Sequence, residues 1–444
     1  MAVLQNRQEC VNVPQSRSRD DESTEMNQQL AQAVIATFRD TDRDAHARRL
    51  ASFHVRDWRR SMHWLDASGL ALYFRSRINF LRLEESVPPE LANALDSRLA
   101  DNRVRTAALF KEFECINRAF QAAGLQYANL KGFTLVPDYC PDPSQRCQFD
   151  LDFIMSSSEA LVCREILNNF GYVQTGKCDD VVEFKAGMEQ ACSIEDLYKP
   201  RTQRAVEVHL IPQTQPATST SGPLARIQTQ VWNEVGFPAF SDTDKFLWQA
   251  RHLFRHVKSE WTRISWLLEF RTFVTAHRDE SEFWQQVRQE AANSDEDALA
   301  VGIAVWLATT AFGEFAPPAL MEWSSDVLPE PMRLWLECYG TRVLLADFPG
   351  TKLYLLLARE LSKGNDFRKV HWGKVLPLHR PPRVTYPSGG SVPWSIRASF
   401  SEMRFTLFRT RFHIAEGTRY LIEVQRWKRI INGMPGWGIR PDLH

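Results

Sequence analysis

Hydrophobic positions recur every three or four residues in the first part of the chain, the spacing of helices that bury one face. The stretches "HVRDWRRSMHWLDASGLALYFRSRINFLR" (54–82) and "VPPELANALDSRLADNRVRTAALFKEFECINRAFQAAGL" (87–125) show this spacing most clearly. Gly124 provides a helix stop near the end of the second stretch. We therefore predict a helical region over 26–105, preceded by a polar, disordered tail over 1–25.

The pattern changes after Gly124, where apolar and polar residues alternate as they do in strands. The segments "FDLDFIM" (149–155) and "RAVEVHLI" (204–211) alternate most regularly. Further short strands are predicted over "QYANL", "VVEFKAG" and "ACSIEDLY". The segment "SSSEALVCREILNNFGY" is typical of a helix capped by serine. The pattern therefore predicts an α/β core over 106–212.

A connector rich in proline, serine and threonine, "PQTQPATSTSGP", follows this core. Beyond it, helical spacing returns in "DTDKFLWQARHLFRHV" and "WTRISWLLEFRTFVTAH", which predicts a helical domain over 224–375. Residues 376–444 are predicted to form a linker and one long amphipathic helix over 396–431. The whole pattern predicts an α+β fold that is predominantly helical.

The composition agrees with a large globular protein. The chain has 444 residues, 44% of them apolar, which is enough for two or three domains. Its 54 basic and 54 acidic residues balance, so no overall field attracts nucleic acid or an anionic membrane. The longest apolar span, Ala300 to Phe312, is shorter than the ~20 residues that cross a bilayer and is predicted to be a core helix. The N-terminus lacks a secretory signal and the eight cysteines lack zinc spacing, so we expect a reducing, cytoplasmic location.

Two aspartates separated by one residue occur five times in the chain, but only one such pair has apolar neighbours on both sides. That pair is Asp150 and Asp152, within "FDLDFIM". Residues i and i+2 of a strand point to one face, so both carboxylates would project together. Adjacent carboxylates share a proton or bind a cation, and Mg²⁺ suits carboxylate and phosphate oxygens. The alternative is a strand near a sheet edge with a solvated polar face.

Other charged residues strengthen the case for a site around this pair. Lys131 and Gly132 follow a short predicted strand, where glycine lets a backbone approach a phosphate and lysine adds positive charge. Arg146 could clamp a phosphate through two hydrogen bonds. Glu207 and His209 share one face of a later strand, and Glu207 supplies a third carboxylate. Three carboxylates with nearby lysine and arginine favour metal-assisted phosphoryl transfer.

Each of these residues also has a purely structural interpretation. Lys131 could be a surface charge in a turn, and His209 a hydrogen-bonded structural histidine. Arg146 could simply form an ion pair with Asp142 or Asp150.

Two weaker features remain. His252 and His256 lie four residues apart on a predicted helix, a spacing found in some metal sites. Because the glutamate of H-E-x-x-H is missing, a structural role facing the wall of the site is favoured. The last predicted helix is rich in arginine, and a solvated face is favoured there over binding of an anionic acceptor.

The stretch "NLKGFTLVPDYCPDPSQRCQFDLDFIM" (129–155) resembles the signature of the uncharacterised nucleotidyltransferase family, part of the DNA polymerase β-like nucleotidyltransferase superfamily. The matching residues are Leu130-Lys131-Gly132, Tyr139, Asp142-Pro143, Arg146 and Asp150-Leu151-Asp152. Looser similarity extends the resemblance over roughly residues 50 to 280 and includes "VEVHL" and "LWQARHLFRHVKSEWTRISWLLEF". The chain departs from the superfamily's Gly-Ser step, because Phe133 follows the Lys-Gly pair.

The resemblance implies a small mixed-sheet nucleotidyltransferase core flanked by N-terminal and C-terminal helical regions. It implies three acids that are catalytic and hold two Mg²⁺ ions: Asp150, Asp152 and Glu207. It also implies that Lys131, Gly132 and Arg146 bind the nucleotide. His209 is added to this nucleotide-binding set because it shares a face with Glu207, where it could touch the nucleotide or orient that acid.

The implied reaction moves a nucleoside monophosphate from an NTP, with ATP favoured, to an unidentified acceptor and releases pyrophosphate. The acceptor would be a small molecule, a protein or a peptide; a membrane is excluded, and the balanced charge disfavours nucleic acid. A catalytically silent module that binds a nucleotide or a protein on the same fold is the main alternative. Transfer of a different phosphoryl group and modification of a nucleic acid also remain open.

Overall fold

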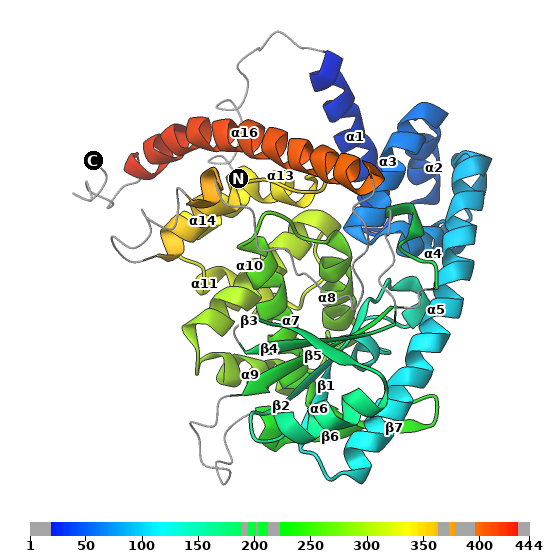
Figure 1. Ribbon diagram of the computed structural model, residues 1–444. Coiled ribbons are helices and arrows are strands. Elements are labelled where there is room, and N and C mark those ends of the chain that lie inside the picture. Colours follow the sequence, from blue (N-terminus) through cyan, green and yellow to red (C-terminus); the bar gives the residue numbers. More distant parts are fainter. Residues whose placement is uncertain are drawn as a thin grey trace.

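The computed structural model consists of helices packed around one sheet (Figure 1). It describes residues 19–178, 180–187, 194–200, 203–211, 223–362, 373–377 and 396–433. Most of the predicted disordered tail and most of the predicted connector over 212–223 lie outside these ranges. The last residues of the predicted tail, from Arg19 on, belong to a helix.

Seven strands form the sheet, in the order β3-β4-β5-β2-β1-β7-β6. Their bounds are β1 Tyr127–Leu130, β2 Asp150–Ser156, β3 Val173–Cys178, β4 Val181–Ala186, β5 Arg204–Ile211, β6 Ile227–Trp232 and β7 Val235–Phe240. Strand β2 pairs in parallel with β5, and β1 pairs in parallel with β7, whereas the other pairs are antiparallel. The sheet is therefore mixed, which confirms the predicted α+β fold.

The sheet differs from the sequence prediction at three places. Strands β6 and β7 follow the predicted core, and the pattern misses them because β6 is a largely polar edge strand and β7 contains Pro238. Within "ACSIEDLY", residues 194–196 form a 3-10 helix, so the strand predicted there is wrong. This turn packs against a helix, where Arg105 donates to the carbonyl oxygen of Leu197. The helix after β2 is preceded by Glu159 at its N-cap, with no serine cap. The division into domains stays a prediction.

In the described part of the chain, five helices precede the sheet. They are α1 Arg19–Ala36, α2 Arg43–Ala51, α3 Val55–Ser68, α4 Ala71–Leu81 and α5 Pro89–Ala122. Helix α5 has 34 residues and runs beside the sheet (Figure 1). Helix α6 (Ala160–Asn169) lies between β2 and β3 in the chain. Short 3-10 turns are η2 Glu84–Ser86, η3 Gly132–Leu135, η4 Pro143–Gln145, η5 Ile194–Asp196 and η6 Pro223–Arg226.

The chain after β7 is helical, as the pattern predicts. Its helices are α7 Asp242–Val257, α8 Ile264–Ala276, α9 Ser281–Ala291, α10 Asp295–Phe312, α11 Pro318–Asp326, α12 Glu330–Trp335, η7 Leu336–Gly340, α13 Thr341–Leu344, α14 Tyr354–Leu361 and α16 Ile396–Asn432. Helix α16 agrees with the helix predicted over 396–431. Helix α10 is almost entirely buried, as predicted for its apolar span. Among the described helices, none is both long and apolar enough to cross a membrane.

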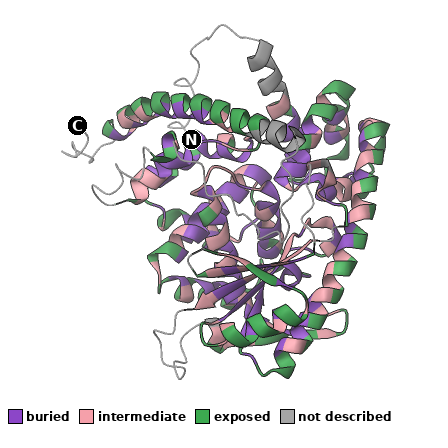
Figure 2. Cartoon of the chain, in the orientation of Figure 1, coloured by how far each residue is buried: buried purple, intermediate pink, exposed green. Residues whose placement is uncertain are grey.

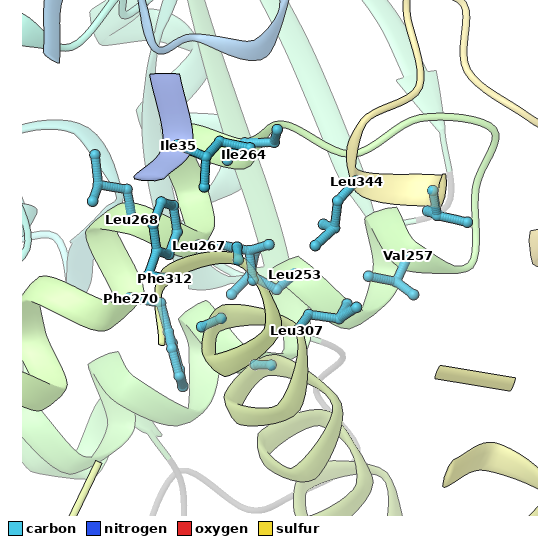
Figure 3. Packing of buried hydrophobic residues seen from close by; sticks show 14 of the residues in the cluster. Ile35, Leu253, Val257, Ile264, Leu267, Leu268, Phe270, Leu307, Phe312 and Leu344 are labelled. Carbon is cyan, nitrogen blue, oxygen red and sulfur yellow. The ribbon is translucent and has the colours of Figure 1, made fainter. Parts of the chain in front are cut away.

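A large apolar cluster joins the N-terminal helices to those that follow the sheet. Figure 3 shows part of it, where side chains from α7, α8 and α10 meet Ile35 of α1 and Leu344 of α13. Because these residues come from both ends of the chain, their burial fixes the N-terminal helices against the later ones.

A second apolar cluster covers one face of the sheet. Leu151, Phe153 and Met155 of β2 and Val206 and Val208 of β5 are buried there against α5 and α6. The central strand β2 is buried along most of its length, whereas exposed residues occur in the edge strands (Figure 2). Since successive strand residues point to opposite faces, the residues between these apolar ones project from the other face. That other face carries the acids of both strands.

Candidate active site

The parallel pairing of β2 with β5 brings the predicted acids together. Asp152 lies opposite Glu207 in the register, and Ile154 lies opposite His209. Asp150 stands two residues before Asp152 on the same face of β2. Asp152 is 5% exposed, so its carboxylate is buried beside the more open Glu207. The structure thus places the three acids on one face of two adjacent strands.

Lys131 lies at the end of β1, where Leu130 pairs with Asp152 of β2. Its Nζ donates a hydrogen bond to Asp152 Oδ1 at 2.8 Å. Its backbone has φ 51° and ψ −154°, a conformation that is costly for a residue with a Cβ atom. This strained turn directs the chain out of the strand and the lysine side chain toward the acids.

Gly132 follows with a positive φ of 51°. A Cβ atom at this position would collide with the side-chain amide of Gln148. Gln148 in turn donates to the carbonyl oxygen of Asp150 at 2.8 Å. The positive φ therefore favours glycine at this position, and a Cβ atom would also displace the side chain of Gln148.

The donor set suits a divalent metal ion. Asp152, Glu207 and His209 each offer a ligand atom, and these atoms lie within 4.8 Å of one another. His209 Nε2 is 3.4 Å from Asp152 Oδ1 and 3.9 Å from Glu207 Oε2. Carboxylate oxygens and imidazole nitrogen are common metal ligands in proteins. The predicted third member of the metal set, Asp150, lies beside this group.

The acids do not titrate alike. Burial and the neighbouring Asp152 carboxylate raise the pKa of Asp150 to about 6. Burial and the same carboxylate raise the pKa of Glu207 to about 7. Burial opposes ionisation of Asp152 too, but Lys131 and His209 hold its pKa below the usual range. Asp152 is therefore the permanent anion of the group, and the other two are poised near neutral pH.

Burial acts to lower the pKa of the Lys131 ammonium, but the three surrounding carboxylates outweigh it and raise that pKa. The ammonium stays charged and acts as the internal counter-ion of the group. One lysine faces three acids, so the site keeps an excess of negative charge whenever all three are ionised. Such an excess favours binding of a cation.

Arg146 pairs with neither of the partners that its sequence position suggested. Its Nε donates to Glu269 Oε1 of α8 at 3.2 Å, and Tyr73 of α4 donates to the same oxygen at 2.8 Å. The side chain of Arg146 is 15% exposed. It still lies close enough to Asp150 to favour the ionised carboxylate. Arg146 is thus fixed by α8 while its positive charge acts on the acids.

Several residues near the site come from α7 and the loop before α8. The rings of His252 and His256 contact each other and Trp266, with centroids 4.3 to 4.7 Å apart. Burial and then Lys131 lower the pKa of both histidines, that of His256 to about 4, so both are neutral. Their ring contacts agree with the favoured structural role, and their place at the wall of the site stays a prediction. Within the described residues they join no third metal ligand.

Arg263 is the site residue that sequence reasoning misses. It lies above the ring of Phe149, 5.4 Å from its centroid, and its charge favours ionisation of Asp150. Its Nε is buried without a hydrogen-bond partner. No motif marks this arginine, because it approaches the acids only where the start of α8 meets the segment before β2. A cavity of about 490 Å³ elsewhere, between α1, α3 and α16, includes none of these residues.

The chain was compared with protein families, with curated proteins and with solved structures. Residues 54–313, more than half of the chain, match the family model described as uncharacterised nucleotidyltransferase. No curated protein matches the chain. One similar solved structure is an antigenic nucleotidyltransferase-like protein from Paracoccidioides brasiliensis. It is 10% identical, the match covers 50% of this chain and 96% of that chain, and the TM-score of 0.27 is too low to support a structural conclusion.

Proposed function

The chain belongs to the uncharacterised nucleotidyltransferase family, and from this premise we propose that it moves a nucleoside monophosphate from an NTP to an acceptor, releasing pyrophosphate. The observation that supports this most is the register of β2 and β5, which sets Asp152 beside Glu207. Lys131 donates a hydrogen bond to the carboxylate of Asp152. ATP is the favoured donor. The acceptor is proposed to be a small molecule, a protein or a peptide.

Divalent metal, proposed to be two Mg²⁺ ions, would be held by Asp150, Asp152 and Glu207 and would neutralise the triphosphate and activate the acceptor oxygen. In the proposed reaction the acceptor oxygen bonds to the α-phosphorus as the bond from that phosphorus to the pyrophosphate oxygen breaks. Glu207 is proposed to act either as a metal ligand or as the base that takes the acceptor proton, and without metal its buried position beside two carboxylates raises its pKa to about 7.

Lys131 is proposed to exchange partners during binding. In the structure its ammonium neutralises Asp152, and a triphosphate would offer it an alternative anion. Gly132 would let the backbone of the same turn approach a phosphate. Arg146 would add positive charge from a position fixed by Glu269. The position of His209 favours a role toward the metal over the predicted contact with the nucleotide.

The proposal is tested by following pyrophosphate release and label transfer from α-³²P-labelled NTPs, with mass measurement of the product. Asp152→Asn should abolish both signals. Asp295→Asn is a matched control, because Asp295 begins another Asp-x-Asp sequence and is exposed on α10. An active wild-type protein whose activity survives Asp152→Asn would refute the proposed site.

The alternative function, a silent module that binds nucleotides or proteins, predicts binding of NTP without any transfer. Transfer of a different phosphoryl group would label the product from the γ-position instead of the α-position. The cytoplasmic location inferred from the sequence remains a prediction.

A further inference from the structure

His209 lies beside two of the acids that are candidates for binding a metal, Asp152 and Glu207. It follows Glu207 by two residues on β5 and projects from the same face of the sheet. It is 9% exposed, and its ring packs edge-on against Trp248 with the centroids 5.7 Å apart. Among the described residues, its polar contacts are those with Asp152 and Glu207.

The distances fit shared coordination better than a direct hydrogen bond. The separation of 3.4 Å between His209 Nε2 and Asp152 Oδ1 is long for an N–H···O bond, which is usually about 2.9 Å. Nε2 is also 3.9 Å from Glu207 Oε2. Ligand atoms around one ion, each ~2.1 Å from it, are separated by ~3 Å when adjacent and ~4 Å when opposite. The nitrogen thus lies at ligand spacing from both oxygens.

A second observation shows that this point attracts a cation. Lys131 Nζ is bonded to Asp152 Oδ1, the same oxygen that His209 approaches. Asp152 therefore binds positive charge even without a metal. A metal ion that replaces the ammonium there would meet both Asp152 and His209.

We propose that His209 Nε2 is a metal ligand, and that the set Asp152, Glu207 and His209 selects a first-row transition ion such as Mn²⁺ over Mg²⁺. Imidazole nitrogen binds transition ions well, whereas Mg²⁺ prefers sites made of oxygen. This inference rests on the proposed function only in placing a divalent ion at these carboxylates. It adds one ligand, and at this position it replaces the Mg²⁺ of the proposed function by a transition ion.

The first experiment measures binding of Mn²⁺ and of Mg²⁺ by titration calorimetry on the full chain. Wild-type protein should bind Mn²⁺ at least about tenfold more tightly than Mg²⁺. His209→Asp should keep binding but lose most of this preference, because an oxygen ligand replaces nitrogen. His256→Gln is the matched control and should keep it. Equal affinity for both ions in wild type would overturn the proposal.

The second experiment detects the ligand itself. Pulsed electron paramagnetic resonance of the Mn²⁺-loaded protein should show coupling to a directly bound ¹⁴N nucleus. The coupling should disappear in His209→Asp and persist in His256→Gln. Its absence from wild type, or its survival in a folded His209→Asp variant, would contradict the assignment. Thermal unfolding verifies that each variant is folded.

The outcomes separate this inference from the proposed function. A ¹⁴N signal in a protein that never transfers a nucleotide would support the ligand and refute the reaction. Nucleotide transfer in a protein without that signal would support the reaction and refute the ligand.

Discussion

Buried acids have different partners in the helical part of the molecule and on the open face of the sheet. In the helical part, Asp66 of α3 receives two hydrogen bonds from Arg98, both at 2.9 Å. Asp244 of α7 is bound by Arg226 in the same two-pronged manner. On the sheet, by contrast, three acids share the single ammonium of Lys131.

We expect this difference between acids with a structural role and acids with a functional role. A buried carboxylate is costly unless it has a partner, and each of these two helical acids receives two hydrogen bonds from an arginine. On the sheet, burial and repulsion between the neighbouring carboxylates raise the pKa values of Asp150 and Glu207, and the single ammonium of Lys131 does not offset these effects. A region that keeps such an imbalance is suited to binding a cation or moving a proton.

The largest expected effect concerns Asp152→Asn. We expect NTP-dependent pyrophosphate release to fall by at least about a thousandfold, because a central anion for metal binding is lost. The thermal midpoint should change less than in a variant of a structural acid, because Lys131 still faces two carboxylates. Pyrophosphate release and calorimetry measure the two effects. If Asp152→Asn caused a large loss of stability without a specific loss of activity, the proposed difference between the two regions would be wrong.

Asp66→Asn is expected to lower the stability of the protein and not its activity. Removing one charge of a buried pair costs about 3 to 5 kcal/mol, because the arginine is left without its partner. Urea unfolding measures this loss. Asp96→Asn, in a pair whose acid is half exposed, is the control and should cost below about 1 kcal/mol. Equal losses of stability in the two variants would show that the buried pair is no more stabilising than the exposed pair.

The next effect concerns Lys131→Met. We expect the rate of nucleotide transfer to fall by about a hundredfold, since a charge that meets the phosphates is lost. Metal binding measured without NTP should become tighter, because no ammonium then competes for Asp152. Calorimetry with Mn²⁺ measures it, and Lys111→Met, at an exposed position of α5, is the control. Weaker metal binding in Lys131→Met would exclude such competition.

The smallest expected effect is the pH dependence of the metal-free protein. The folded chain holds the protons of Asp150 and Glu207 up to pKa values of about 6 and 7, above the ordinary 3.8 and 4.5. Between these values the folded state binds more protons than the unfolded state, so stability falls as pH rises. With EDTA present, the thermal midpoint should drop by several degrees from pH 5 to pH 8. Asp150→Asn should reduce the drop, and an unchanged drop would show that other groups cause it.

Much of the site could be predicted from local pattern. The alternation in "FDLDFIM" and "RAVEVHLI" fixed which residues share a face, and the structure brings Asp152 and Glu207 together as predicted. Lys131 also lies beside the acids. These features depend on strand periodicity, which one sequence carries.

The rest depends on contacts between distant segments. Arg146 pairs with Glu269, a residue 123 positions away, and no spacing rule could select that acid over nearer ones. Arg263 acts on Asp150 only because the start of α8 meets the segment before β2. Strand β6 lies at the sheet edge with exposed polar residues, so its sequence resembles a loop. The periodicity of a sequence does not indicate which distant segments pack against each other.

The parallel pairing of β2 with β5 also has a consequence for biosynthesis. A chain still on the ribosome that ends before Arg204 contains Asp150, Asp152 and Lys131 but not Glu207. Parallel neighbours need a long connection, which in this chain runs through α6 and the β3–β4 hairpin. The acid group is therefore incomplete until β5 has been made and paired.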